Sequence, residues 1–186
     1  MKQGSGRSAV KGNTDRRRDA ADAARQAALL GLLSALAVAL SFLEGLLPVL
    51  PVPGAKLGLS NIVTMYALSV MNLPAALAVA VIKSLFALLR GGTAFFMSLA
   101  GGLLSTLVMA AALKWPRGRL SFLGTGILGA VAHNAAQLGV SMLLLSPSLI
   151  WYGPWLLLMA LAAGTLTGLT LNIVMPALSR INPGGR

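Results

Sequence analysis

The sequence contains no cysteine, one histidine and only four acidic residues. The lack of cysteine excludes disulfide bonds, thiolate metal sites and a cysteine nucleophile. With one histidine the H-E-x-x-H zinc motif is impossible. Three of the four acidic residues precede the apolar part of the chain, as Asp15, Asp19 and Asp22, so no carboxylate pair is available for acid/base catalysis or for magnesium. We therefore expect no metal, no cofactor and no enzymatic activity.

Nucleotide-binding loops are missing as well. In a P-loop, backbone amides of a G-x-x-x-x-G-K-[ST] turn and its lysine hold the phosphates. No lysine of this chain follows such a glycine loop. Any work driven by ATP must therefore come from another chain.

What the chain has in abundance is apolar sequence. Hydrophobic residues make up 56% of it and charged residues 10%, and its mean hydropathy is +0.81. A bilayer core requires about 20 apolar residues per helix, and runs without charge cover 27–43, 57–82, 91–113 and 120–179. The composition predicts an all-α integral membrane protein, with the lipid bilayer as its surroundings, and excludes one soluble domain.

The net charge of +11 would indicate nucleic acid as the partner of a soluble protein, but its placement here indicates membrane orientation. Most cations gather in three places: Lys2, Arg7, Lys11, Arg16, Arg17, Arg18 and Arg25 before the first apolar run, then Lys114, Arg117 and Arg119, then Arg180 and Arg186. Cytoplasmic loops and tails carry such an excess. We therefore expect no nucleic-acid partner.

The run 57–82 decides the number of spans. Read as one helix, it leaves nine cations inside and six outside. A break at Asn72-Leu73-Pro74 is favoured because proline begins helices and disfavours helix for the residue before it. It gives twelve cations inside and three outside or within the membrane. The positive-inside rule favours this second topology, so we predict six transmembrane helices with cytoplasmic N- and C-termini.

Proline and serine punctuation gives the boundaries of the expected spans, which are about 27–47, 58–71, 74–90, 93–113, 120–145 and 149–175. The second span is short, which suggests a steep or partly sheltered helix. Aromatic belts mark membrane interfaces, and we expect Trp151, Tyr152 and Trp155 at the outer one and Trp115 at the inner one. The six-helix domain then covers 27–178, and 179–186 form a short cytoplasmic tail.

Residues 1–26 form a basic cytoplasmic tail. No fold is expected for 1–13, which are small and polar, whereas 15–26 are compatible with an interfacial helix on the inner leaflet. A solvated tail that only fixes orientation is an alternative. A cleavable signal is another, but the 17-residue run 27–43 exceeds a typical signal core.

Polar residues within the apolar region fall mainly in the outer half of the expected spans. They are Glu44, Lys56, Asn61, Lys83, Arg90, His133, Asn134 and Gln137. Lys83 lies among apolar residues, where burying an unpaired ammonium costs about 2.5–3.5 kcal/mol, so it needs a partner or a ligand. Lys83 and Arg90 are two helical turns apart and share a face, as do His133 and Gln137, which are four apart.

Two interpretations of this set remain open. In the first, it lines a cavity open to the outside that binds a small molecule with an anionic group. In the second, Glu44 pairs with Lys83 or Arg90, and His133 satisfies a neighbouring group, so the set is structural. Intramembrane ionisable residues are both paired and functional as a rule.

Small residues four apart occur in three spans and let helix backbones approach closely. The sets are Gly31, Ala35 and Ala39 in the first span, Gly101 and Ser105 in the fourth, and Gly164 and Gly168 in the sixth. For the fourth and sixth spans we expect packing inside the bundle. The first set remains open to a contact with another chain.

Three segments carry a family resemblance: PGAKLGLSNIVT at 53–64, the stretch 83–92, and FFMSLAGGLLS at 95–105. They resemble the Gx transporter family, whose members are often labelled heptaprenyl diphosphate synthase component I. That family is similar to the substrate-binding S-components of energy-coupling factor (ECF) transporters. The resemblance covers about 27–178, and K-L-G-L-x-N-I is its most specific part.

This resemblance implies a six-helix S-component-like bundle in the bacterial cytoplasmic membrane that captures a vitamin-like or precursor molecule from outside. It implies a site in the outer half, covered by the loop at about 48–57. Its partners would be a transmembrane coupling subunit, contacted through Gly31, Ala35 and Ala39, and two ATPase subunits. The synthase label implies the alternative of a non-catalytic accessory protein of isoprenoid or quinone metabolism, because the chain lacks aspartate-rich motifs.

Overall fold

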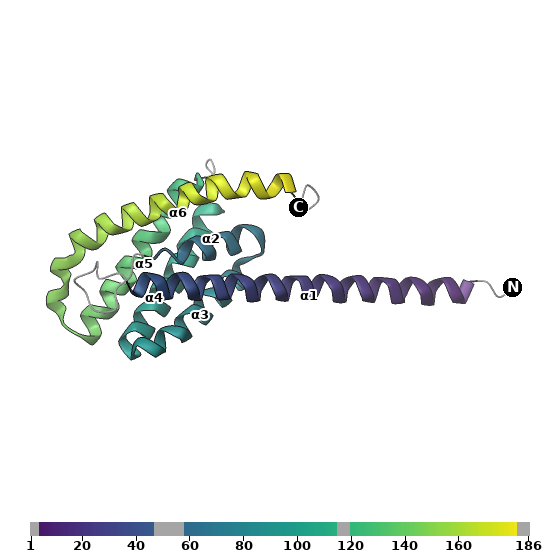
Figure 1. The fold of residues 1–186 in the computed structure, drawn as a ribbon, viewed down its shortest axis with the longest axis horizontal. Helices are drawn as coiled ribbons and strands as arrows, with labels where there is room; N and C mark the ends of the chain where they lie inside the picture. The colour runs from purple at the N-terminus through teal and green to yellow at the C-terminus, as the bar shows by residue number, and fades with distance from the viewer. Residues whose placement is uncertain (1–3, 47–57, 115–119, 182–186) are drawn as a thin grey trace. The chain divides into compact units, whose positions relative to one another are not determined.

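The computed structural model describes residues 4–46, 58–114 and 120–181, and within these ranges all regular structure is helical. In chain order the helices are α1 (Gly4–Gly45), α2 (Asn61–Val70), α3 (Leu73–Ala87), the 3₁₀ turn η1 (Leu88–Arg90), α4 (Gly92–Leu113), α5 (Phe122–Leu144), the 3₁₀ segment η2 (Pro147–Tyr152) and α6 (Gly153–Ile181) (Figure 1). The expected all-α class is confirmed.

Five helical segments of the described chain have the length and composition to cross a membrane. They are Arg16–Gly45, Leu73–Arg90, Gly92–Leu113, Phe122–Leu144 and Pro147–Ala177. The sixth, α2, has 10 residues and is therefore about 15 Å long, half of a bilayer core. The described residues form six α-helices, as many as the expected spans, but α2 by itself is too short for a full span.

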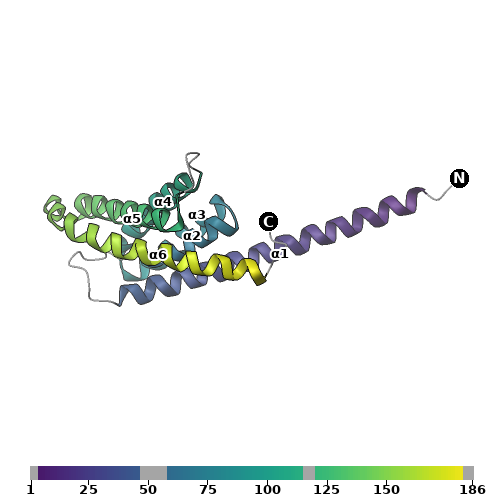
Figure 2. The same ribbon diagram turned by 90° about the horizontal axis from the view of Figure 1, so that it is seen from above.

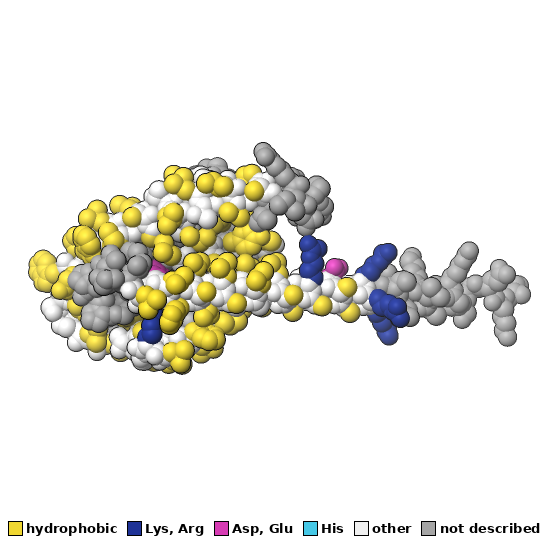
Figure 3. Space-filling view, viewed as in Figure 1, with side chains coloured by type: hydrophobic (Ala, Val, Ile, Leu, Met, Phe, Trp, Pro, Cys, Tyr) yellow, Lys and Arg dark blue, Asp and Glu magenta, His cyan; other side chains and the backbone are white. Residues whose placement is uncertain are grey.

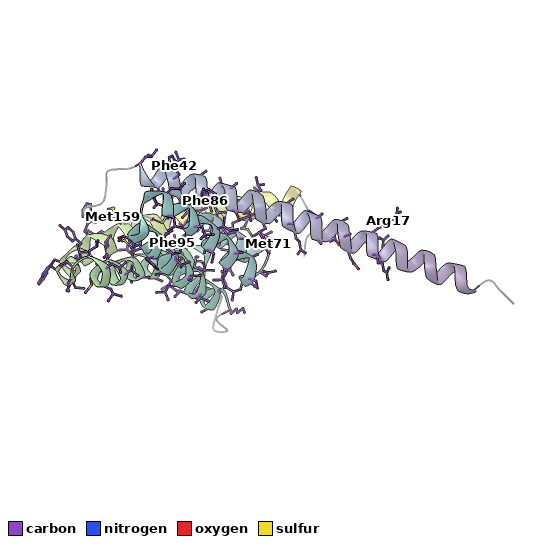
Figure 4. The ribbon with its side chains drawn as sticks, turned by 90° about the horizontal axis from the view of Figure 1, so that it is seen from below. Arg17, Phe42, Met71, Phe86, Phe95 and Met159 are labelled. Carbon is purple, nitrogen blue, oxygen red and sulfur yellow. The ribbon has the colours of Figure 1, made fainter. Side chains whose placement is uncertain are left out.

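The chain divides into two compact units, Met1–Leu32 and Leu33–Arg186. The first unit contains the N-terminal part of α1, in which 15–26 are helical and carry Arg16, Arg17, Arg18 and Arg25. The dark-blue side chains of this unit in Figure 3 are lysine or arginine side chains, and Arg17 is labelled in Figure 4. Whether this segment lies on the inner leaflet remains a prediction.

The predicted break between the second and third helices is confirmed. Helix α2 ends at Val70, and α3 begins at Leu73. The side chain of Asn72 accepts a hydrogen bond of 2.9 Å from the Ala75 amide, and Pro74 lies in the first turn. Both features are typical of a helix start, so α2 and α3 form an antiparallel hairpin.

Glycines bring α5 and α6 into backbone contact. A methyl group added at Gly126 would lie 2.6 Å from the Gly164 carbonyl oxygen, and one added at Gly164 would lie 2.5 Å from the Ile127 Cα. Both views place α5 beside α6 and beside α4 (Figures 1 and 2). The expected internal packing of Gly164 and Gly168 is confirmed, because Gly168 also contacts α5.

The surface of the second unit is largely apolar. Hydrophobic side chains cover most of the face in Figure 3 that belongs to this unit. Large hydrophobic residues such as Leu89, Leu143 and Ile173 are more than 70% exposed, which would be costly in water but is favourable in lipid. The buried positions, in contrast, include many small and polar residues. This distribution fits a helical bundle embedded in a membrane.

Candidate functional site

Lys83 lies in α3 with only 1% of its surface exposed. Its ammonium donates hydrogen bonds to Ser60 Oγ at 3.0 Å and to Asn61 Oδ1 at 3.1 Å. Both partners are themselves buried, at 2% exposure. The cation is therefore held by polar groups at the start of α2, which offsets part of the cost of its burial.

The depth of this contact follows from the α2–α3 hairpin. Asn61 is the first residue of α2, nine residues before its end, and Lys83 is ten residues into α3. The start of α2 therefore lies level with Lys83, while α3 and η1 continue for about 10 Å to Arg90. A short helix thus begins inside the bundle rather than at its end.

Glu44, near the C-terminal end of α1, completes the contact from another direction. Its carboxylate is buried and accepts hydrogen bonds from the Gly58 amide and, at 3.2 Å, from the Leu59 amide. These amides directly precede α2, where the helix dipole favours a negative charge. Glu44 is also an electrostatic neighbour of Lys83 and Arg90, so one carboxylate stands against two cations.

Gly58 and Gly101 make room for His133. Gly58 has a φ of +87°, which favours glycine, and a methyl group there would lie 3.3 Å from the imidazole. A methyl group at Gly101 of α4 would lie 2.8 Å from two ring atoms of His133. The histidine is 2% exposed. It therefore packs between α4 and the segment that begins α2.

The two amide side chains of α5, Asn134 and Gln137, lie in different surroundings. Gln137 is fully buried, one helical turn beyond His133. Asn134 turns to α6 instead, where its Nδ2 donates a 2.9 Å hydrogen bond to the Leu156 carbonyl. Asn134 therefore lies outside the cluster formed by Glu44, Ser60, Asn61, Lys83 and His133, which we call the polar cluster.

A cavity of about 600 Å³ lies beside the polar cluster. One wall is α1, from Ser34 to Phe42, and the other is α3 with η1, from Ile82 to Arg90. Phe42 and Phe86, labelled in Figure 4, stand on the two walls. Lys83 and Arg90 both line this space, and we call it the α1–α3 cavity.

The remaining residues that the sequence predicted for the site or for a contact with a coupling subunit lie in three kinds of place. Ala35 and Ala39 are exposed and line the α1–α3 cavity, whereas Gly31 belongs to the first unit. Arg90 is exposed and lies against Gly45, where an added methyl group would overlap its guanidinium. Lys56, the loop 48–57, Trp115, Arg117 and Arg119 lie outside the described residues.

Sequence reasoning missed Ser34 and Ser60. Ser60 contacts Lys83 directly, and its place beside Asn61 in the most specific segment of the resemblance was the available signal. Ser34 lines the α1–α3 cavity at 5% exposure, and its hydroxyl has no hydrogen-bond partner within the part of the chain that the structure describes. Nothing in the sequence distinguishes it from other helical serines.

Residues 33–174, more than half of the chain, match the family model described as heptaprenyl diphosphate synthase component I. The chain belongs to this family. The match extends from the second half of α1 into α6 and so includes the polar cluster and the α1–α3 cavity. No curated protein and no solved structure matches the chain.

Proposed function

We propose that this protein is the membrane-embedded substrate-binding subunit of an importer of the ECF type. It would capture a small vitamin-like or precursor molecule with an anionic group from the outer side of a bacterial cytoplasmic membrane. A coupling subunit and two ATPase subunits would supply the energy. The observation that carries this proposal is Lys83, a buried cation that also lines the α1–α3 cavity.

The position of Lys83 supports binding over a purely structural role. A lysine needed only for packing has no reason to border an open volume of about 600 Å³, which falls within the range of small-molecule sites. A second cation, Arg90, borders the same volume. The start of α2 inside the bundle is also typical of transporters, whose substrate sites form where helices are interrupted near mid-membrane.

The distribution of charge supports the orientation. The half of the bundle that contains the start of α2 also contains Gly45 and Arg90, whereas the basic cluster beginning at Lys114 follows the far end of α4. The positive-inside rule then assigns the polar cluster to the outer half. A substrate arriving from outside would reach the level of Lys83 after passing Arg90.

The family description favours a second candidate. A protein described as component I of a synthase is one part of an enzyme, and this chain would then be the non-catalytic membrane partner of a prenyl synthase in isoprenoid or quinone metabolism. In that case the polar cluster would serve packing. The two candidates differ in the partner that each requires.

Affinity purification of the tagged protein from its native membranes in a mild neutral detergent tests the proposal. An importer subunit should bring with it one further membrane protein and two P-loop ATPases, identified by mass spectrometry. Recovery of a soluble prenyl synthase in their place would favour the accessory role and overturn the importer. An unrelated membrane protein that carries the same tag, purified from the same cells, gives the background.

A further inference from the structure

The lining of the α1–α3 cavity is mostly apolar. Val38, Phe42, Ile82, Phe86 and Leu89 supply its bulk, and Ala35 and Ala39 supply its width, because they leave space that larger side chains would fill. Polar ligands bind where hydrogen-bonding groups replace water. Such walls therefore suit an apolar ligand body and disfavour a sugar or a nucleoside.

The charged groups lie toward one end of this space. Arg90 is level with Gly45 at the end of α1, while Ser34 lies eleven residues earlier on the same helix, about 16 Å away along its axis. Lys83 already donates to Ser60 and Asn61. The exposed guanidinium of Arg90 is thus the group best placed to receive an anion.

Among the described residues, the net charge at this site favours an anion with one negative charge. Lys83 and Arg90 bring two positive charges to the cavity, and Glu44, the electrostatic neighbour of both, offsets one. A diphosphate would require further cations or magnesium, and in the described residues no group of three or more His, Cys, Asp or Glu side chains stands ready for a metal. A carboxylate fits a single guanidinium through two parallel hydrogen bonds.

Ser34 gives an independent indication of a ligand. Its hydroxyl is buried on the cavity wall and lacks a hydrogen-bond partner among residues 4–46, 58–114 and 120–181. Buried hydroxyls are normally satisfied. A polar atom at the far end of a bound molecule would give the Ser34 hydroxyl a hydrogen-bond partner.

We propose that the α1–α3 cavity binds an amphipathic monoanion, a carboxylate held by Arg90 with an apolar body between the two helices. A water molecule takes up about 30 Å³ in the liquid; with the same volume for each non-hydrogen atom of a ligand, the cavity of about 600 Å³ admits a molecule of up to about 20 such atoms. This inference rests on the proposed function, because it names the ligand class of the same site.

Equilibrium binding of radiolabelled dodecanoate to the full-length protein in phosphatidylcholine nanodiscs tests it, with empty nanodiscs as the background. We expect saturable binding that unlabelled dodecanoate displaces and that butanoate, dodecanol and geranyl diphosphate displace at least tenfold more weakly. Equal displacement by phosphatidylglycerol would show that the cavity holds ordinary bilayer lipid and would overturn the proposal. Tighter binding of geranyl diphosphate would overturn the single charge.

Matched variants separate the cavity from the general apolar surface. Arg90→Gln should weaken binding about tenfold, the effect of one charge-assisted contact, and Lys114→Gln should not, because Lys114 is exposed outside the cavity. Ala39→Leu should weaken binding by a similar factor by filling the space. Ala162→Leu, at an exposed position of α6, should leave it unchanged, and equal effects within either pair would overturn the proposal.

The hydroxyl of Ser34 has its own probe. In the same assay 12-hydroxydodecanoate should bind several times more tightly than dodecanoate, and Ser34→Ala should remove that difference. Equal binding of the two probes to the unmodified protein would overturn the part assigned to Ser34. If no dodecanoate binds while the purified protein still brings ATPase partners, the ligand class is wrong and the importer role stands.

Discussion

The ammonium of Lys83 and the side-chain oxygen of Asn61 are 3.1 Å apart, which joins the middle of α3 to the first residue of α2. Glu44 approaches the same point from α1 through the amides of Gly58 and Leu59. These contacts join α1, α2 and α3 at the buried polar cluster, to which His133 of α5 also belongs. The side chains of Glu44 and Lys83 therefore stabilise the start of α2.

Removing the charge of Lys83 should lower the stability of the protein, because the start of α2 is held by this side chain. Lys83→Met leaves Glu44 facing Arg90 alone and removes the donor for Ser60 and Asn61, which we expect to cost about 3–5 kcal/mol. The double variant Lys83→Met with Glu44→Gln should cost less than the sum of the single variants, because it removes both charges. Thermal unfolding in detergent of all four proteins measures this coupling, and strictly additive losses would show that the two charges do not interact.

Gly101 should be intolerant of any side chain. Gly101→Ala places a methyl group 2.8 Å from the His133 ring and 3.1 Å from its carbonyl oxygen, so His133 or α4 must move, at about 1–3 kcal/mol. Gly139→Ala in α5 is the control, since nothing lies within 4 Å of its added methyl group. It should be neutral or slightly stabilising, and an equal loss in both variants would contradict the close packing of His133.

The glycine contact between α5 and α6, which lies outside the polar cluster, should also be intolerant of a side chain. Gly164→Ala drives a methyl group to 2.5 Å from the Ile127 Cα, and because backbone cannot rotate away, the helices must separate. We expect a lower melting temperature than for Gly139→Ala, with ligand binding unchanged once the protein is folded. Loss of ligand at full stability would indicate that the α5–α6 contact shapes the site.

Membrane orientation is testable because the chain has no cysteine of its own. Ser148→Cys should react with a membrane-impermeant maleimide in intact cells, since η2 lies at the predicted outer end. Lys114→Cys should react only after the membrane is opened. The reverse pattern would invert the topology and remove the outer access on which substrate capture depends.

The composition of the chain and its helix-breaking residues predicted much of the fold. Apolar runs and Pro74 were enough to predict the apolar helices and the break between α2 and α3, because both depend on local chemistry. Two expected helix ends were wrong: α1 is helical from Gly4, where no fold was expected, and α6 continues through Pro176 to Ile181. Lys83 and His133, both expected within the apolar region, are buried in the structure, and their part in ligand binding remains a prediction. The alternative that Glu44 pairs with Lys83 or Arg90 stays a prediction, although Glu44 is an electrostatic neighbour of both cations.

What the sequence did not reveal depends on contacts between helices. The start of α2 inside the bundle follows from its register against α3, and a run of apolar residues does not record register. Asn134 shares the α5 segment of His133 but bonds to α6, a direction that spacing alone does not distinguish. Ala35 and Ala39, expected to contact a coupling subunit, line the α1–α3 cavity, and that contact remains a prediction.

The central claim is that the α1–α3 cavity, which Lys83 and Arg90 both line, holds a small anionic molecule. Native mass spectrometry of the protein, purified gently from native membranes, tests it most directly when compared with Lys83→Met and with the exposed-site control Lys114→Gln. We predict one co-purifying molecule with a negative charge on the unmodified protein and on Lys114→Gln, and its loss from folded Lys83→Met. Equal retention by all three proteins, or no bound molecule on any of them, would contradict the claim.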